Sequence, residues 1–265
     1  MKRICFAVLP AVMMLCLSVT TPRWSTPTKH TADTALKTEN GRKVPPAGSK
    51  NAAKVKKRTV SAMNRDNVKV VGNPDSTLVL VNKYFKLPDH FIPKDLIEVQ
   101  VPFISGQHSE KTKMRRPAAK ALERLFIAAE KDGIHLAGVS AYRSRRMQQV
   151  LFNHYVQKDG EKRALTYSAR PGTSEHESGL AVDVSGASGQ GAASPAFART
   201  AEATWLSRHA AKYGFIIRYP QGKENITGYE YEAWHLRYVG EAAAETMVKH
   251  HLTLEEYLEK VPVVG

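Results

Sequence analysis

The change in composition near residue 73 is the feature that most restricts how this chain of 265 residues can fold. Residues 21–72 are rich in Thr, Lys, Pro, Ala and Asn and show no apolar periodicity, so we expect a flexible basic linker there. A packed core must therefore form within residues 73–265, a length that suits one domain.

The formal charge of +14 would suggest a nucleic-acid partner if it were spread over the folded part. The first 70 residues, however, hold 14 of the 39 Lys and Arg but only 3 of the 25 acidic residues, which leaves 25 basic and 22 acidic side chains in the rest. We therefore expect no nucleic-acid partner. The basic run at residues 54–58 is either a solvated segment or a site of attraction to an anionic wall polymer or membrane surface.

Residues 1–20 have the charge-then-apolar order of an export signal, with Lys2 and Arg3 before an apolar run that is short for a membrane span. We expect a signal peptide or a short anchor, and in either case a domain exported to the extracellular, cell-wall or periplasmic face of the cytoplasmic membrane. Both cysteines, Cys5 and Cys16, lie in this segment. Its removal would leave no thiol for nucleophilic catalysis, zinc binding or disulfides.

Residues 73–265 alternate short strand patterns with helical ones, which predicts an α+β fold. Pro117 can occupy the first turn of a helix whose apolar residues recur at spacings of three and four, and Gly133 can end it. Thr253 and Glu256 form a capping-box pattern before a closing helix. Further helices are expected at residues 145–158 and 205–213, and strands at residues 78–81, 134–139, 180–184, 215–219 and 231–239.

Residues 174–183 and 232–235 contain the side-chain types of a catalytic metal site. His176 and Asp183 are seven residues apart, and a loop that turns at Gly179 into a strand can aim both at one point. His235 comes from another predicted strand. Two histidines and a carboxylate leave the fourth position of a tetrahedral zinc ion open for water. Each residue alone has an ordinary explanation, such as a turn cap for Asp183 or a surface ion pair for Glu232, so the hypothesis depends on the combination.

These segments resemble the M15B family of zinc D,D- and L,D-carboxypeptidases, which includes the vancomycin-resistance D-Ala-D-Ala carboxypeptidases. The family pattern S-x-H-x-x-G-x-A-x-D is matched at residues 174–183, and E-x-W-H at residues 232–235. A Y-R-S segment begins at Tyr142, with Gln148 five residues after its arginine. Ala233 stands where relatives often have proline. The resemblance spans roughly residues 78–257 and implies a small antiparallel sheet flanked by helices, as in the hedgehog/D,D-peptidase zinc fold.

The resemblance implies one zinc ion bound by His176, Asp183 and His235. Glu232 is implied to be the general base, which takes a proton from the attacking water and delivers it to the leaving amine. Removal of the terminal D-Ala from peptidoglycan stem peptides, as a D-alanyl-D-alanine carboxypeptidase, is the expected reaction.

Four further residues resemble family positions around the substrate. Arg143 would face the scissile carbonyl and stabilise the oxyanion. Gln148 and Ser174 are similar to substrate-contacting residues, and Tyr142 either lines the pocket or packs in the core.

Other peptidoglycan enzymes fit less well. The chain has no S-x-x-K and no K-T-G for a serine penicillin-binding enzyme, and no H-E-x-x-H for that class of metalloprotease. Three alternatives stay open: an L,D-carboxypeptidase acting on tetrapeptides, a peptidoglycan endopeptidase of the same fold, and a non-catalytic wall-binding module. A general base at Glu232 argues against the module, because binding alone needs none. The sequence does not decide between the D,D and L,D bonds.

Overall fold

The computed structural model describes residues 68–260. The predicted signal or anchor and residues 21–67 of the predicted linker lie outside this range. Its first strand, β1 (Lys69–Val70), belongs to the last residues of the predicted linker and pairs in parallel with β2 (Phe85–Lys86). Within residues 68–260, no helix combines the length and the apolar character needed to cross a membrane.

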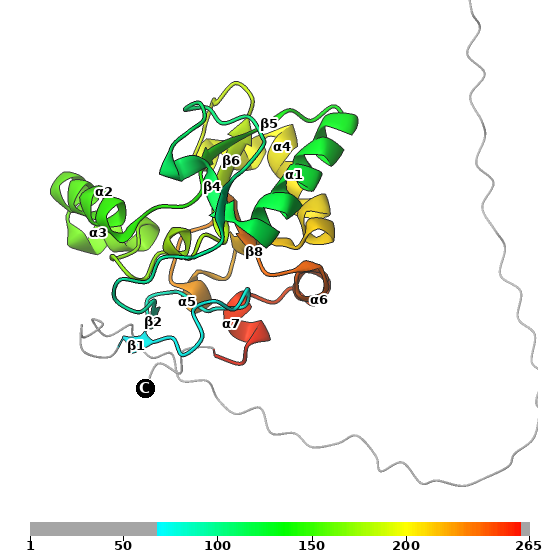
Figure 1. Ribbon diagram of the computed structural model, residues 1–265. Coiled ribbons are helices and arrows are strands. Elements are labelled where there is room, and N and C mark those ends of the chain that lie inside the picture. The colour runs from blue at the N-terminus through cyan, green and yellow to red at the C-terminus, as the bar shows by residue number, and fades with distance from the viewer. Residues whose placement is uncertain (1–67, 261–265) are drawn as a thin grey trace, which may run out of the picture. The chain divides into compact units, whose positions relative to one another are not determined.

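A four-stranded antiparallel sheet forms the centre of the domain and confirms the predicted α+β class (Figure 1). Its strands lie in the order β5-β6-β8-β7, so the two strands in the middle come from distant parts of the sequence. A separate two-stranded antiparallel sheet pairs β3 with β4. The bounds are β3 (Leu96–Glu98), β4 (Lys113–Arg115), β5 (Leu136–Ser140), β6 (Ala181–Gly186), β7 (Phe215–Tyr219) and β8 (Glu232–Tyr238).

Two helices, α1 (Arg116–Lys131) and α4 (Ala201–His209), share the main apolar core with the central sheet (Figure 1). The apolar stripe of α1 is fully buried, as its spacing predicts, and Gly133 follows the helix at φ +74°. From the sheet, alternate residues such as Val182 and Leu236 join the same core. The neighbouring Asp183 and His235 therefore face the opposite side of the sheet.

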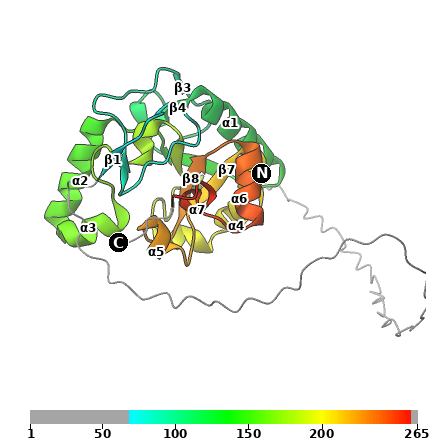
Figure 2. The same ribbon diagram turned by 90° about the horizontal axis from the view of Figure 1, so that it is seen from below.

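On that side a helical hairpin of α2 (Arg145–Asp159) and α3 (Glu161–Tyr167) projects away from α1 (Figure 1). Figure 2 shows α5 (Glu224–Thr227), α6 (Glu241–Lys249) and α7 (Leu254–Tyr257) gathered near β7 and β8. The capping box predicted from Thr253 and Glu256 is formed at the start of α7. Short 3-10 turns lie at Glu110–Thr112, Glu175–Ser178, Pro195–Arg199 and Ala210–Tyr213.

The prediction of a strand at residues 78–81 is wrong, although the segment is buried as expected. Its backbone does not pair with the central sheet. The carbonyls of Thr77 and Val79 instead accept hydrogen bonds from Nη2 of Arg237, at 2.9 and 2.8 Å. A buried guanidinium thus satisfies acceptors that a neighbouring strand would otherwise have to satisfy. An apolar run alone does not distinguish these two arrangements.

Candidate active site and metal centre

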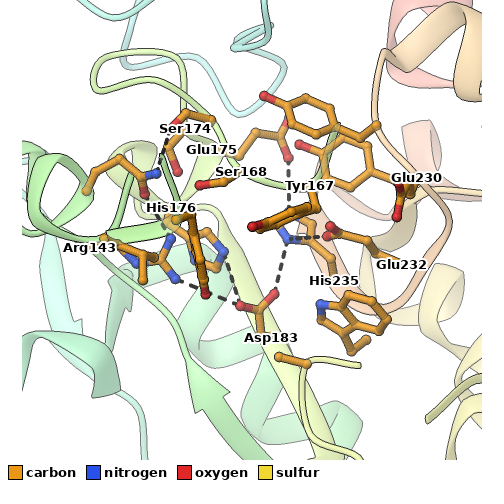
Figure 3. Close-up of a pocket in the computed structure, with 18 of the residues that line it drawn as sticks. Arg143, Tyr167, Ser168, Ser174, Glu175, His176, Asp183, Glu230, Glu232 and His235 are labelled. Carbon is orange, nitrogen blue, oxygen red and sulfur yellow. Dashed lines mark hydrogen bonds and ion pairs between the residues drawn. The ribbon is translucent and has the colours of Figure 1, made fainter. Parts of the chain in front are cut away.

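Three segments that are far apart in the sequence converge on a cavity of about 290 Å³ (Figure 3). Arg143 follows β5, the 3-10 turn Glu175–Ser178 precedes β6, and Glu232 begins β8. The cavity is also lined by residues of α2, α3 and the loop after β6, among them Tyr155, Tyr167, Ser168, Ala193 and Pro195.

Asp183 and His235 are direct cross-strand partners in the β6–β8 ladder. His235 Nδ1 lies 3.1 Å from Asp183 Oδ1, yet no hydrogen bond joins them, and Oδ1 is buried without a hydrogen-bonding partner. His176 reaches the same carboxylate from the turn, with Nε2 3.3 Å from Asp183 Oδ2. One ligand atom from each of the three residues lies within 4.8 Å of the others, and all three residues are buried.

Gly179 makes the turn that the sequence predicts between His176 and Asp183. It has φ +69°, the left-handed conformation, and follows the 3-10 turn directly. A Cβ atom here would meet Leu96 Cδ2 at 2.9 Å and Arg115 Cγ at 3.0 Å. Glycine is thus required here both because the backbone is left-handed and because no room is left for a Cβ atom.

A bulge brings Glu232 to the same face as His235. In a regular strand, residues three apart point to opposite faces. Between Ile217 and Tyr219 of β7, however, the partner residue on β8 moves from Leu236 to Glu232, so β8 holds two extra residues. The alternation of faces is broken within this irregular stretch, and Glu232 Oε2 lies 3.7 Å from His235 Nδ1.

Burial and neighbouring charges shift the pKa values of Glu232, His235 and Asp183. Burial raises the pKa of Glu232 to about 8, with smaller opposing effects from His235 and Arg143. Burial would lower the pKa of His235, but the neighbouring carboxylates of Asp183 and Glu175 outweigh it and raise the pKa to about 9. Burial opposes ionisation of Asp183, yet the two histidines hold its pKa below the usual range. The carboxylates thus favour positive charge between the rings, as a bound cation would supply.

Arg143 is fixed beside the three residues. Nη1 donates to Gln148 Oε1 at 2.9 Å, Nη2 donates to Ser140 Oγ at 3.3 Å, and Nη2 lies 4.0 Å from Asp183 Oδ2. The Gln148 side chain is buried and its Nε2 donates to the carbonyl of Ala169 at 2.8 Å. Because both ends of its amide are occupied, Gln148 is better placed to orient Arg143 than to contact substrate.

The two remaining predicted substrate contacts differ in position. Ser174 lines the cavity and is labelled in Figure 3. Tyr142 is buried and is not among the lining residues. The structure therefore places it in the core, which is the second of the two positions considered for it.

Sequence reasoning missed the buried ionic partners behind His235. Glu175 lies inside the matched pattern, and its carboxylate contacts Arg218 and Arg237, all with fully buried side chains. An arginine inside the otherwise apolar run at residues 215–219 was a usable signal, because an interior charge requires a partner.

Comparison with known proteins gives consistent likenesses. The profile of the VanY family, described as D-alanyl-D-alanine carboxypeptidase, matches residues 111–241. The putative carboxypeptidase YodJ of Bacillus subtilis (strain 168) is 47% identical over 196 residues, which cover 74% of this chain and 72% of that one. The solved LD-carboxypeptidase LdcB, whose structure concerns peptidoglycan recognition, is 46% identical with a TM-score of 0.70 and covers 76% of this chain and 94% of that one.

A mutant of the D,D-pentapeptidase VanY from a VanB-type vancomycin-resistance cassette was solved with Zn(II). It is 32% identical, with a TM-score of 0.56 and coverage of 69% of this chain and 98% of that one. These structures confirm the predicted fold.

Proposed function

Because the chain belongs to the VanY family of carboxypeptidases, we propose that it removes the terminal D-alanine from peptidoglycan stem peptides with one zinc ion as cofactor. The convergence of His176, Asp183 and His235 at the cavity that Glu232 lines carries this proposal. Two buried histidines and a carboxylate are a zinc donor set that leaves a position open.

The donor set fits a metal ion in a specific respect. Asp183 Oδ1 and His235 Nδ1 approach each other without a hydrogen bond, and the Asp183 oxygen has no other partner. A cation between these atoms would satisfy the buried oxygen. When bound there, zinc would supply Lewis acidity toward a water molecule and the scissile carbonyl.

In this proposal Glu232 transfers the proton of the attacking water, and Arg143 stabilises the negative charge that forms on the carbonyl oxygen. The Glu232 carboxylate takes a proton from water as the water oxygen bonds to the carbonyl carbon, and returns it to the nitrogen as the C–N bond breaks. Arg143, held by Gln148 and Ser140, presents a fixed cation for the oxygen that becomes negative. Ser174, on the cavity wall, is placed for a substrate contact.

Two specificities compete for the scissile bond. The greater identity to the LD-carboxypeptidase LdcB, 46% against 32% for the D,D-pentapeptidase, supports action on tetrapeptides ending in D-alanine. The family description supports the D,D bond of pentapeptides, which is the reaction expected from the sequence. We put the L,D bond first on this difference in identity.

Other parts of the proposal rest on sequence alone. Export follows from the charge-then-apolar order of residues 1–20, and attraction of the linker to an anionic wall polymer or membrane surface follows from its basic run.

The deciding experiment is mass spectrometry of purified muropeptides with four- and five-residue stems after incubation with the zinc-loaded protein, with Glu232→Ala as control. Loss of alanine from the tetrapeptide establishes the L,D reaction, and loss from the pentapeptide alone establishes the D,D reaction. Internal cleavage would indicate an endopeptidase instead. Zinc binding without any cleavage would indicate a wall-binding module.

A further inference from the structure

The two histidines of the site face Asp183 through different ring nitrogens. His176 presents Nε2 and His235 presents Nδ1. A neutral histidine binds a metal through the nitrogen that lacks a proton, so the other nitrogen must be an N–H that finds an acceptor. In His176 this is Nδ1, which lies 2.7 Å from the carbonyl oxygen of Ala141. The acceptor of His235 must therefore lie at its Nε2.

A carboxylate oxygen lies beside this nitrogen. Glu175 Oε2 lies 3.6 Å from His235 Nε2. Both atoms are buried, and neither has a hydrogen-bonding partner within residues 68–260. Each would cost free energy if left unpaired, so each is the natural partner of the other. Figure 3 shows Glu175 and Asp183 on opposite sides of His235.

Arginines fix the Glu175 carboxylate through its other oxygen. Oε1 accepts from Arg218 Nε at 2.7 Å and from Arg237 Nη1 at 2.5 Å. Arg218 also pairs with Glu255, through Nη1 at 3.0 Å and Nη2 at 2.7 Å. We call Glu175, Arg218, Arg237 and Glu255 the buried charge cluster. Its two positive and two negative groups cancel, so it supplies an acceptor without adding net charge behind the site.

The buried charge cluster also connects the site to both ends of the described chain. Glu255 belongs to α7 and accepts from Asn82 Nδ2 at 3.0 Å. Arg237 donates to the carbonyls of Thr77 and Val79. The segment before β2 thus binds Arg237, and α7 binds Arg218 through Glu255. These two arginines in turn bind the Glu175 carboxylate.

We propose that Glu175 is the positioning residue of His235: its Oε2 accepts the Nε2–H hydrogen bond, which leaves the Nδ1 lone pair directed at the metal. The inference rests on the zinc ligands of the proposed function. It concerns the orientation of one ligand and is independent of the bond that the enzyme cleaves. Partners of this kind commonly change metal affinity by about 10- to 100-fold when removed.

Glu177 provides a matched control. It lies in the same short turn, on the other side of His176, and its carboxylate is also buried and paired with an arginine. It accepts hydrogen bonds from Arg145 Nε and the backbone N–H of Gly172 rather than from His235. Glu255→Gln is a second control, because it disturbs the same buried charge cluster without touching His235.

The first measurement is Zn²⁺ affinity by competition with a chromophoric chelator, on the full chain and its variants, with thermal unfolding of the metal-free forms alongside. We expect Glu175→Gln to weaken zinc binding by about 10- to 100-fold. Glu177→Gln and Glu255→Gln should stay within about threefold of the parent. A Glu175→Gln protein that is folded and binds zinc like the parent overturns the proposal. Equal losses in Glu175→Gln and Glu255→Gln also overturn it, because they would show a purely structural role.

A second measurement does not depend on any variant folding. Nitrogen-15 NMR of the zinc-loaded parent reports which ring nitrogen of His235 carries the proton. We expect a protonated Nε2 and a metal-bound Nδ1, and a protonated Nδ1 overturns the proposal. If the parent binds no zinc, the proposed function fails as well. If it binds zinc and only Glu175→Gln gives the unexpected result, the inference alone fails.

Discussion

Asp183 and His235 lie directly opposite each other on adjacent antiparallel strands, with Oδ1 and Nδ1 3.1 Å apart. The sheet therefore fixes two of the three proposed ligands through its register, because a one-residue slip would turn either side chain into the helix-covered core. Only His176 depends on a turn. Rigid elements thus hold two of the three ligands.

Replacement of Glu232 by glutamine should separate metal binding from catalysis. Glutamine keeps the shape of the side chain but cannot accept and return a proton. We expect unchanged zinc content by elemental analysis and a loss of kcat of about 10²- to 10⁴-fold. Glu230→Gln, at the rim of the same cavity, is the control and should retain most of the activity. Near-parental turnover in the Glu232 variant would remove it from the role of base.

Loss of one ligand should remove the metal without unfolding the domain. His176→Ala deletes a buried donor, so we expect the zinc content to fall well below one ion per chain. The exposed His154→Ala serves as control and should bind zinc normally. An unchanged zinc content in the His176 variant, measured by elemental analysis, would contradict the ligand set.

Gly179→Ala should be costly for two separable reasons. The left-handed conformation costs a residue with a Cβ about 1–2 kcal/mol, and the new methyl group would also overlap Leu96 and Arg115. Gly222→Ala has the same conformational cost at φ +81°, with no atom within 4 Å of the new Cβ. Urea unfolding should show a larger loss of unfolding free energy for Gly179→Ala than for Gly222→Ala. Gly179→Ala should also bind zinc more weakly than the parent. Equal losses would mean that the close approach has no effect.

Truncation should distinguish the linker from the start of the fold. Removal of residues 1–67 should leave kcat/KM on soluble peptides unchanged, because no described site residue lies there. Removal of residues 1–72 also deletes β1 and its pairing with β2, so we expect a lower midpoint in urea. A large loss of activity from the shorter truncation would show that the predicted linker takes part in catalysis.

The burial of Lys83 gives a pH dependence with a defined sign. Burial lowers its pKa from 10.5 to about 8, with a smaller effect from Arg170. Between these values the unfolded chain binds more protons than the folded one, so stability rises with pH. Relative to Lys83→Met, the parent should gain up to about 2 kcal/mol of unfolding free energy from pH 7 to 9.5. The same difference in unfolding free energy between the parent and Lys83→Met at both pH values, measured with urea, would contradict this.

The sequence by itself determined the local structure and the chemical types of the site. Apolar spacing predicted α1, the capping box predicted the start of α7, and Gly179 predicted the turn between His176 and Asp183. These features depend on interactions between neighbours in the chain, which a single sequence displays directly.

Tertiary structure alone decided how the distant residues meet. The β8 bulge places Glu232 on the face of His235, and the choice of partner strand places Asp183 opposite it. The Arg237 guanidinium, not a neighbouring strand, satisfies the carbonyls of Thr77 and Val79, and Glu175 lies beside His235. Each outcome depends on partners from other elements of the chain, and local propensity carries no information about which partner a buried group will find.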